Sequence, residues 1–218
     1  MAERILKNEF KALSQEKWVN VELQDDDIFN WTIALIVINP DSLYYGGYFL
    51  ANMKFPSNYP YSPPEFQFTR PLYHPNIYQD GKLCISILHA PGDDEMSGEL
   101  AAERWSPAQR VESVLLSIIS LLDDAETSSP ANVDAGVMLR KDPEGFRKRV
   151  QQDVDVSRKD IPEGFVMPTH ESTTKAPEKE IEDPNFWVDS GSEDGFGGSD
   201  TDMEEEDEEQ EQETEEDD

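Results

Sequence analysis

Apolar residues recur at helical spacing near the start of the chain, alternate with polar residues over 19–23 and form an almost wholly apolar run over 31–38. Residues 2–17 predict an amphipathic helix, with one apolar side made of Ala2, Ile5, Leu6, Phe10 and Leu13. Four strands are expected after it, separated by turn-forming residues: 19–23, 31–38, 48–53 and 66–68. Because the connections are short, we expect an antiparallel meander rather than parallel βαβ units.

The second half of the chain predicts helices. A broad apolar stripe after Trp105 indicates a central buried helix, with Ser106 as N-cap, Pro107 at the first helical position and Gln109 completing a capping box. Two further helices are expected over residues 133–141 and 142–158. The predicted fold class is therefore α+β, with an N-terminal helix, a four-stranded antiparallel meander, a central helix and C-terminal helices.

Four prolines occur within residues 55–64, which excludes a helix or a central strand there. This composition predicts a stiff, extended loop that holds Tyr59 and Tyr61 in place. An exposed aromatic ring held in this way suits recognition of a partner, and packing of the same rings beneath the loop is the alternative.

Charge divides the chain into two parts. It has 48 acidic and 18 basic residues, and residues 171–218 hold 22 of the acids with only Lys175 and Lys179 as bases. We expect a folded domain of residues 1–165 and a disordered acidic tail of residues 166–218, since the tail has too few apolar residues to offset the entropy of ordering. Phe186 and Trp187 are apolar exceptions and candidates for docking to a partner, with chance composition as the alternative.

The composition excludes several classes of protein. One cysteine excludes a framework of internal disulfides, and the few Cys and His residues exclude a structural zinc site, so we expect no metal. No apolar segment marks a signal peptide or a membrane span, and the excess of acids argues against nucleic-acid binding. We therefore expect a protein of the cytoplasm and nucleus, without membrane or nucleic-acid partners, that attracts basic partners over long range.

The only cysteine, Cys84, follows the turn-forming residues Gln79-Asp80-Gly81 and opens a segment of extended, β-branched character. A lone cysteine is often an inert core residue. A pair with His74 would give a nucleophile and a base, but acidic surroundings are expected to raise a thiol pKa rather than lower it. A thiol that accepts an acyl group from an already activated donor tolerates this, so a thioester on Cys84 is the favoured alternative.

An acidic loop of residues 89–103 begins five residues after Cys84. Its lack of periodicity predicts an exposed, mobile loop, and its position allows contact with whatever approaches the thiol. A solvated insertion without a role is the alternative. The acidic residues of this loop are Asp93, Asp94, Glu95, Glu99 and Glu103.

His74-Pro75-Asn76, followed by Cys84 and then by Trp105-Ser106-Pro107-Ala108, resembles the ubiquitin-conjugating enzymes (E2). The proline-rich Tyr59-Pro60-Tyr61-Ser62-Pro63-Pro64 and the order of the predicted elements match as well, over residues 2 to about 158. The resemblance implies the E2 fold and a transferase that takes ubiquitin from the activating enzyme (E1) as a thioester on Cys84 and yields it to a lysine. ATP is then used by E1, and this chain needs no cofactor.

The resemblance also assigns roles to residues. Asn76 would donate to the developing oxyanion or hold the loop beside Cys84, His74 would be structural, and Ser129 would orient the incoming lysine. Acids of the loop, Asp93 to Glu95 foremost, would position or help deprotonate that amine. The surface for E1 and for a RING ligase would comprise the first helix and two loops, namely Arg4, Lys7, Lys11, Tyr61, Pro63, Pro107 and Ala108.

Three features narrow the resemblance: the 20 residues between Cys84 and Trp105, the Ser129-Pro130-Ala131-Asn132 segment and the acidic tail. Together they resemble the cell-cycle E2 subclass that works with cullin–RING ligases of the SCF type. This implies a tail that docks on a basic cullin surface, ubiquitin chains that lead to proteasomal degradation, and a role in cell-cycle progression. A noncatalytic E2-like adaptor and an acidic chaperone of basic proteins are the alternatives; intact Cys84 and Asn76 argue against the adaptor.

Overall fold

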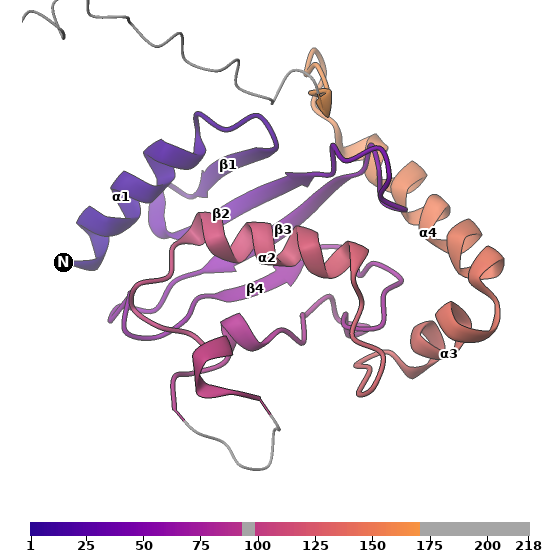
Figure 1. Ribbon diagram of the computed structural model, residues 1–218. Coiled ribbons are helices and arrows are strands. Elements are labelled where there is room, and N and C mark those ends of the chain that lie inside the picture. Colours follow the sequence, from indigo (N-terminus) through magenta and orange to yellow (C-terminus); the bar gives the residue numbers. More distant parts are fainter. Residues whose placement is uncertain (93–98, 171–218) are drawn as a thin grey trace, which may run out of the picture. The chain divides into compact units, whose positions relative to one another are not determined.

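The strands form one antiparallel sheet whose inward-facing side chains build the core. The computed structural model describes residues 1–92 and 99–170. Its strands are β1 (Val19–Gln24), β2 (Asp27–Ile36), β3 (Tyr48–Lys54) and β4 (Glu65–Phe68). They pair in the order β1-β2-β3-β4 and are antiparallel throughout, as short connections require (Figure 1). The predicted α+β fold class, with its meander, is confirmed.

The helices cover one face and both ends of this sheet. They are α1 (Ala2–Leu13), α2 (Val111–Asp123), α3 (Val133–Lys141) and α4 (Pro143–Ser157), with short 3-10 turns η1 (Ser86–Leu88), η2 (Ala101–Glu103) and η3 (Arg158–Asp160). α2 lies across one face, α1 lies at one end, and α3 and α4 lie at the other (Figure 1). Within the described ranges, no helix is long and apolar enough to span a membrane.

Two helix boundaries differ from the prediction. α1 ends at Leu13 rather than near residue 17. At this end the Ser14 hydroxyl donates to the Phe10 carbonyl at 2.7 Å. α2 begins at Val111 rather than at Pro107, because residues 106–109 close a separate turn. The Glu9 carboxylate of α1 accepts a hydrogen bond from the Val111 amide at 2.6 Å, so a charge from another helix, not Ser106, satisfies the start of α2.

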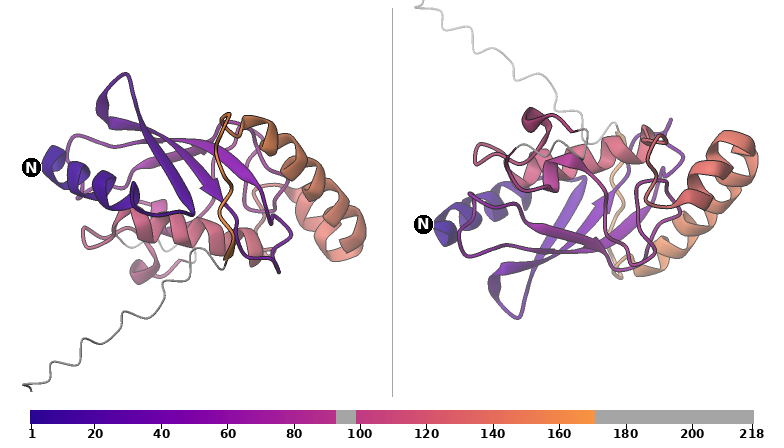
Figure 2. Two further views of the ribbon diagram at one scale, coloured as in Figure 1. Left: turned by 90° about the horizontal axis from the view of Figure 1, so that it is seen from above. Right: turned by 90° about the horizontal axis from the view of Figure 1, so that it is seen from below.

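The chain after α4 covers an apolar part of the outer face of the sheet. Ile161, Phe165 and Met167 pack against the second apolar cluster of the domain, formed by side chains of β2 and β3. The Phe165 ring meets the Tyr48 ring edge-on, with centroids 5.6 Å apart. Figure 2 shows this segment crossing the strands.

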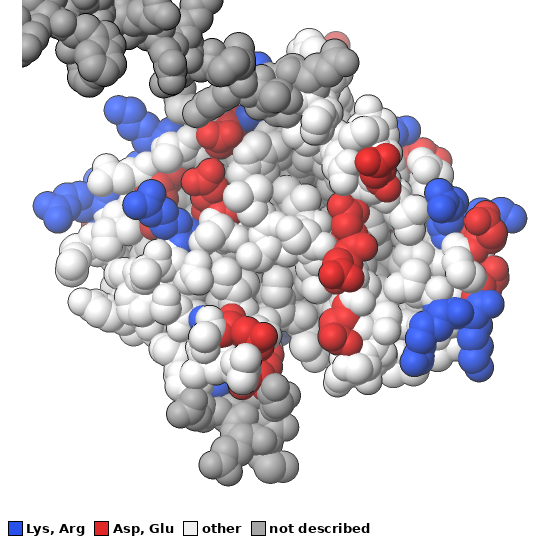
Figure 3. All heavy atoms as spheres, in the orientation of Figure 1, with Lys and Arg blue, Asp and Glu red and all other residues white. Residues whose placement is uncertain are grey.

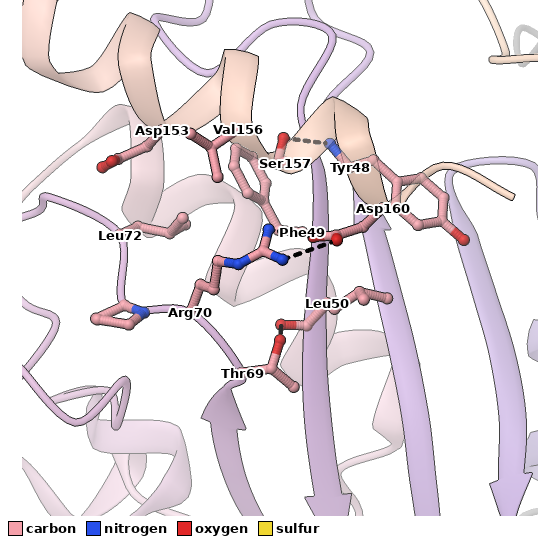
Figure 4. A pocket seen from close by; sticks show the side chains of 11 residues that line it. Tyr48, Phe49, Leu50, Thr69, Arg70, Leu72, Asp153, Val156, Ser157 and Asp160 are labelled. Atoms are coloured by element: carbon pink, nitrogen blue, oxygen red, sulfur yellow. Dashed lines mark hydrogen bonds and ion pairs between the residues drawn. The ribbon is translucent and has the colours of Figure 1, made fainter.

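Contacts at the end of α4 set the direction of this crossing segment. Arg70 pairs with Asp160 through two contacts of 2.5 and 2.9 Å, and the Ser157 hydroxyl accepts from the Tyr48 amide at 3.1 Å (Figure 4). A small pocket of about 50 Å³ lies between these residues. The contact between Ser157 and Tyr48 therefore fixes the end of α4 to β3, and the residues that follow lie over the sheet.

Candidate active site

Cys84 lies at the end of a short hairpin that follows the His74-Pro75-Asn76 turn. The Cys84 amide donates to the Asn76 carbonyl at 2.9 Å, and Ile77 and Leu83 form an isolated antiparallel bridge. Gly81 has a φ of +88°, the positive value that favours glycine in a hairpin turn. The thiol is partly exposed, so a partner can reach it.

The register of this hairpin sorts its side chains onto two faces. Ile77 is fully buried and Leu83 packs against the core. Because successive side chains of an extended segment alternate, Asn76, Tyr78 and Cys84 share the opposite face. Tyr78 is therefore a neighbour of the cysteine that the sequence pattern did not single out, although the Gln79-Asp80-Gly81 turn would have supplied the register.

The titration of Tyr78 agrees with this placement. The negative charge of Cys84 in its thiolate form is the largest cause that raises the pKa of the Tyr78 phenol, followed by desolvation, a hydrogen bond with Cys84 and the charge of Asp80. Tyr78 is 45% exposed, so its ring stands at the surface beside the thiol. An amine that approaches Cys84 from this side passes the Tyr78 hydroxyl.

Asn76 is 2% exposed and its side-chain amide spans to the loop before α3. Its Nδ2 donates to the Glu126 carbonyl and its Oδ1 accepts from the Glu126 amide, both at 2.9 Å. These two bonds hold the loop against the hairpin. An amide nitrogen carries two hydrogens, and among the described residues only one of those on Nδ2 has a hydrogen-bond partner. Donation of the other to an oxyanion remains a prediction.

His74 holds the turn that precedes the hairpin. Its Nδ1 accepts from the Asn76 amide at 3.0 Å, and the side chain is 1% exposed. Burial lowers the pKa of His74 to about 4, and the backbone of Leu121 opposes this shift without offsetting it. Its Nε2 is buried without a hydrogen bond of normal geometry in the described part of the chain. A buried, neutral ring bonded within its own turn suits the predicted structural role better than that of a base for an exposed thiol.

This burial predicts a pH dependence of stability. The unfolded chain binds a proton at His74 below the ordinary pKa of 6.5, whereas the folded chain does so only near 4. The free energy of unfolding should therefore fall between about pH 6.5 and 4, by about 3 kcal/mol from this residue, and no further below that range.

The measurement is urea unfolding of the protein and of His74→Asn at several pH values. The raised carboxyl pKa values of Glu9 and Asp153 act in the opposite sense, but they are common to both proteins and cancel in the difference. Parallel curves for the two proteins across this range would contradict the assignment.

The segment after Cys84 is not the extended run that its β-branched residues predict. Ser86–Leu88 forms the 3-10 turn η1, which packs on α2 with Ile87 buried. The Leu88 amide donates to the Ile85 carbonyl at 3.1 Å instead of to a neighbouring strand. Contact with a helix, rather than local propensity, decides the conformation here.

The base of the acidic loop is closed by the Glu99 carboxylate. It accepts from the Ser86 hydroxyl at 2.9 Å, lies 2.8 Å from His89 Nδ1 and accepts from Arg104 Nε at 3.1 Å. Desolvation raises the pKa of Glu99, but the contacts with His89, Ser86 and Arg104 outweigh it and hold the pKa below its ordinary value. Glu99 thus links Ser86, two residues after Cys84, to Arg104 at the other end of the loop. Glu103 is exposed, and Asp93, Asp94 and Glu95 lie outside the described residues.

Ser129 lies exposed in the connection between α2 and α3. This connection reaches the site through Glu126 and through the Asn132 amide, which donates to the Pro75 carbonyl at 2.8 Å. No hydrogen bond of Ser129 is found among the described residues, and its role toward the incoming lysine remains a prediction.

The two predicted partner loops meet beside α1. Trp105 Nε1 donates to the Pro60 carbonyl at 2.7 Å, and the Tyr59 hydroxyl donates to Glu9 at 2.8 Å. Of the two tyrosines, Tyr59 packs beneath the loop at 2% exposure and Tyr61 stands out at 59%.

The residues predicted to face E1 and a RING ligase are accessible in this structure. Pro63 is half-buried, and the rest of the set is exposed: Arg4, Lys7, Lys11, Tyr61, Pro107 and Ala108. Basic residues also gather at the end of the molecule formed by α3 and α4 (Figure 3). Within residues 1–92 and 99–170, no group of three or more His, Cys, Asp or Glu side chains is arranged to hold a metal. The tail residues Phe186 and Trp187 lie outside the described residues.

Comparison with known proteins identifies the family. Residues 5–154 match the family model of the ubiquitin-conjugating enzymes. Ubiquitin-conjugating enzyme E2-34 kDa of Saccharomyces cerevisiae is 48% identical over 211 residues, which cover 91% of this chain and 71% of the yeast protein. Ubiquitin-conjugating enzyme E2 13 of Arabidopsis thaliana is 49% identical over 136 residues, covering 62% of this chain and 81% of the plant protein. The matched residues include the hairpin that carries Cys84, and the chain belongs to the family of ubiquitin-conjugating enzymes.

Proposed function

We propose that this E2 works with cullin–RING ligases of the SCF type. It takes ubiquitin from E1 on Cys84 and transfers it to lysines of substrates or of ubiquitin, building chains that lead to proteasomal degradation and so promote cell-cycle progression. The cytoplasm and nucleus are the compartments that this role requires. E1 uses ATP, and this chain needs no cofactor.

The transfer consists of two exchanges at one carbonyl carbon. The Cys84 thiolate attacks the thioester held by E1, and the E1 cysteine leaves as its thiolate. The lysine amine then attacks the same carbon, the carbon–sulfur bond breaks, the Cys84 thiol leaves and the amine loses a proton as the amide forms. Asn76 donates its second amide hydrogen to the oxyanion of this step, and Tyr78 borders the path of the amine. Asp93, Asp94 and Glu95 would orient that amine.

The observation that carries the ligase assignment is the extent of the yeast match. The match covers 91% of this chain, which is more than the 165 residues before the acidic tail, so it reaches into the tail. The plant relative matches only 62% of this chain. A tail shared with one relative and strongly acidic in charge supports docking on a basic surface of a ligase subunit, where long-range attraction raises the association rate.

Deletion of residues 171–218 tests this proposal. The truncated chain should form the Cys84 thioester at the rate of the full chain, because the hairpin and the partner loops are intact. Chain growth with a cullin–RING ligase should slow, and the difference between the two chains should be largest at low salt, where charge attraction is least screened. Equal ligase-dependent rates with and without the tail would refute the docking role.

A further inference from the structure

A groove of about 200 Å³ opens next to the hairpin that carries Cys84. It lies between the segment of residues 71–79 and helices α3 and α4. Tyr73 and the neighbouring Pro71 and Leu72 form an apolar part of its lining, and polar groups surround that part: Tyr78, Gln79, Asn132, Asp134 and Arg149. The E1 and ligase loops beside α1 contribute no residue to this lining, so the groove is separate from the surface assigned to those partners.

The groove borders the reaction site through Tyr78. Tyr78 lines it and also shares the hairpin face with Cys84. Asn132, on the opposite wall, donates its amide to the Pro75 carbonyl at 2.8 Å, so this wall is fixed to the turn that holds Asn76. A polypeptide whose lysine reaches Cys84 on the Tyr78 side therefore has its neighbouring residues at the mouth of this groove.

Arg149 presents a fixed positive charge on the groove. Its guanidinium lies 5.5 Å from the centroid of the Tyr73 ring, and its Nη1 lies 3.1 Å from Gln152 Oε1 and 3.5 Å from Asp153 Oδ1. Asp153 is itself held, because it accepts from the Tyr73 amide at 2.7 Å. In the described part of the chain no hydrogen bond engages Nε or Nη2 of Arg149, and its side chain is 49% exposed. The planar guanidinium is thus oriented and retains donors that suit a carboxylate.

Asp134 gives the groove a second charge of opposite sign. It is exposed in the first turn of α3, and together with Arg149 it makes the lining bipolar. An acidic ligand side chain is favoured near Arg149 and disfavoured near Asp134, so the pair also sets the direction in which a segment lies in the groove.

We propose that this groove binds the segment of the acceptor polypeptide next to the target lysine, and that Arg149 pairs with an acidic side chain of that segment. The proposal rests on the transfer function of Cys84 and adds a specificity element to it. The E2 itself, and not only its ligase, then favours lysines that have an acidic residue within a few positions. Arg149 acts on binding of the acceptor and takes no part in the bond exchange.

The test is single-turnover discharge of preformed Cys84 thioester onto short peptides that contain one lysine. In one peptide set, each peptide carries a single glutamate, placed one to four residues before or after the lysine. In the matched set, a dimethylated lysine, which cannot accept ubiquitin, replaces that glutamate. The enzymes are the full chain, Arg149→Glu and Arg147→Glu. Arg147 is on the same helix with its side chain 64% exposed, and it does not line the groove, so it controls for the change in net charge.

For the full chain, the peptide concentration that gives half-maximal discharge should be about three- to tenfold lower for the best glutamate peptide than for its basic counterpart. This is the range expected when a partly exposed ion pair is replaced by a repulsion between like charges. Arg149→Glu should invert that preference, and Arg147→Glu should retain it. The maximal discharge rate should change little, because only acceptor binding is altered.

With normal loading, three results would overturn the proposal. They are no preference in the full chain, equal behaviour of the two charge reversals, or a fall in maximal rate without a change in half-saturation. Thioester formation from E1 is measured on every variant first, and normal loading with no acceptor preference overturns the groove alone. Absence of loading in the full chain overturns the transfer function and this proposal with it.

Arg149→Gln, which keeps polarity without reversing charge, separates loss of the ion pair from disturbance of Tyr73 and should give an intermediate preference.

Discussion

Replacement of Asn76 by alanine is expected to slow transfer of ubiquitin from Cys84 to lysine by about 10²–10³-fold, the effect of removing one oxyanion donor. Loading from E1 should change far less, since exchange between two thiols needs less help than attack by an amine that is protonated at neutral pH. The substitution also removes both hydrogen bonds to the Glu126 backbone, which should lower the free energy of unfolding by about 1–2 kcal/mol.

Discharge of preformed thioester onto free lysine measures this effect, with loading followed separately. Glu126→Ala is the matched control, because it leaves both backbone groups that Asn76 contacts in place. It should discharge at nearly the normal rate. If Asn76→Ala discharged normally while its stability fell, Asn76 would serve only to hold the loop.

Replacement of Trp105 by alanine is expected to destabilise the domain by about 3–5 kcal/mol, the range for a fully buried large aromatic residue. Trp105 is 1% exposed, packs against Tyr59 with ring centroids 5.9 Å apart and donates to the Pro60 carbonyl. Its loss therefore leaves a cavity beneath the proline-rich loop and an acceptor without its donor. Urea unfolding measures the change.

The Trp105 variant should also respond less to a RING ligase, because the two partner loops lose the contact that joins them. Trp105→Phe is the comparison, since it retains most of the packing and lacks the indole N–H, and it should lose about 1 kcal/mol from that bond together with a smaller packing loss. A loss below about 1 kcal/mol for Trp105→Ala would show that the loops are held by other contacts.

The elements that follow from one-dimensional patterns were the predictable part of this fold. β1, β3 and β4 begin and end within one residue of the predicted segments, whereas β2 begins at Asp27, four residues before the apolar run that predicted it. α3 and α4 begin directly after their caps, Asn132 and Asp142. The start of α2 was not predictable in this way, because the group that caps it is Glu9, about a hundred residues earlier in the chain. Likewise, Ser86–Leu88 bends onto α2 although its residues favour a strand.

Likewise, some residues of the site could be found from the sequence and others only from the fold. Cys84 stands out in the sequence as the only cysteine, and the His74-Pro75-Asn76 motif stands out through the resemblance to the E2 family. The partners of Glu99 do not, because they are brought together by closure of the loop from Ser86 to Arg104. The Arg149 groove depends on packing of α4 against residues 71–73, which no local pattern contains. Contacts of this kind need the three-dimensional fold.

The most direct test of the account is thioester formation at Cys84. The full chain is incubated with E1, ATP and ubiquitin, and the products are separated with and without dithiothreitol. We expect one ubiquitin adduct that dithiothreitol removes, and no such adduct with Cys84→Ala. Absence of the adduct from the full chain, or its survival in Cys84→Ala, would contradict the assignment of Cys84 as the residue that carries ubiquitin.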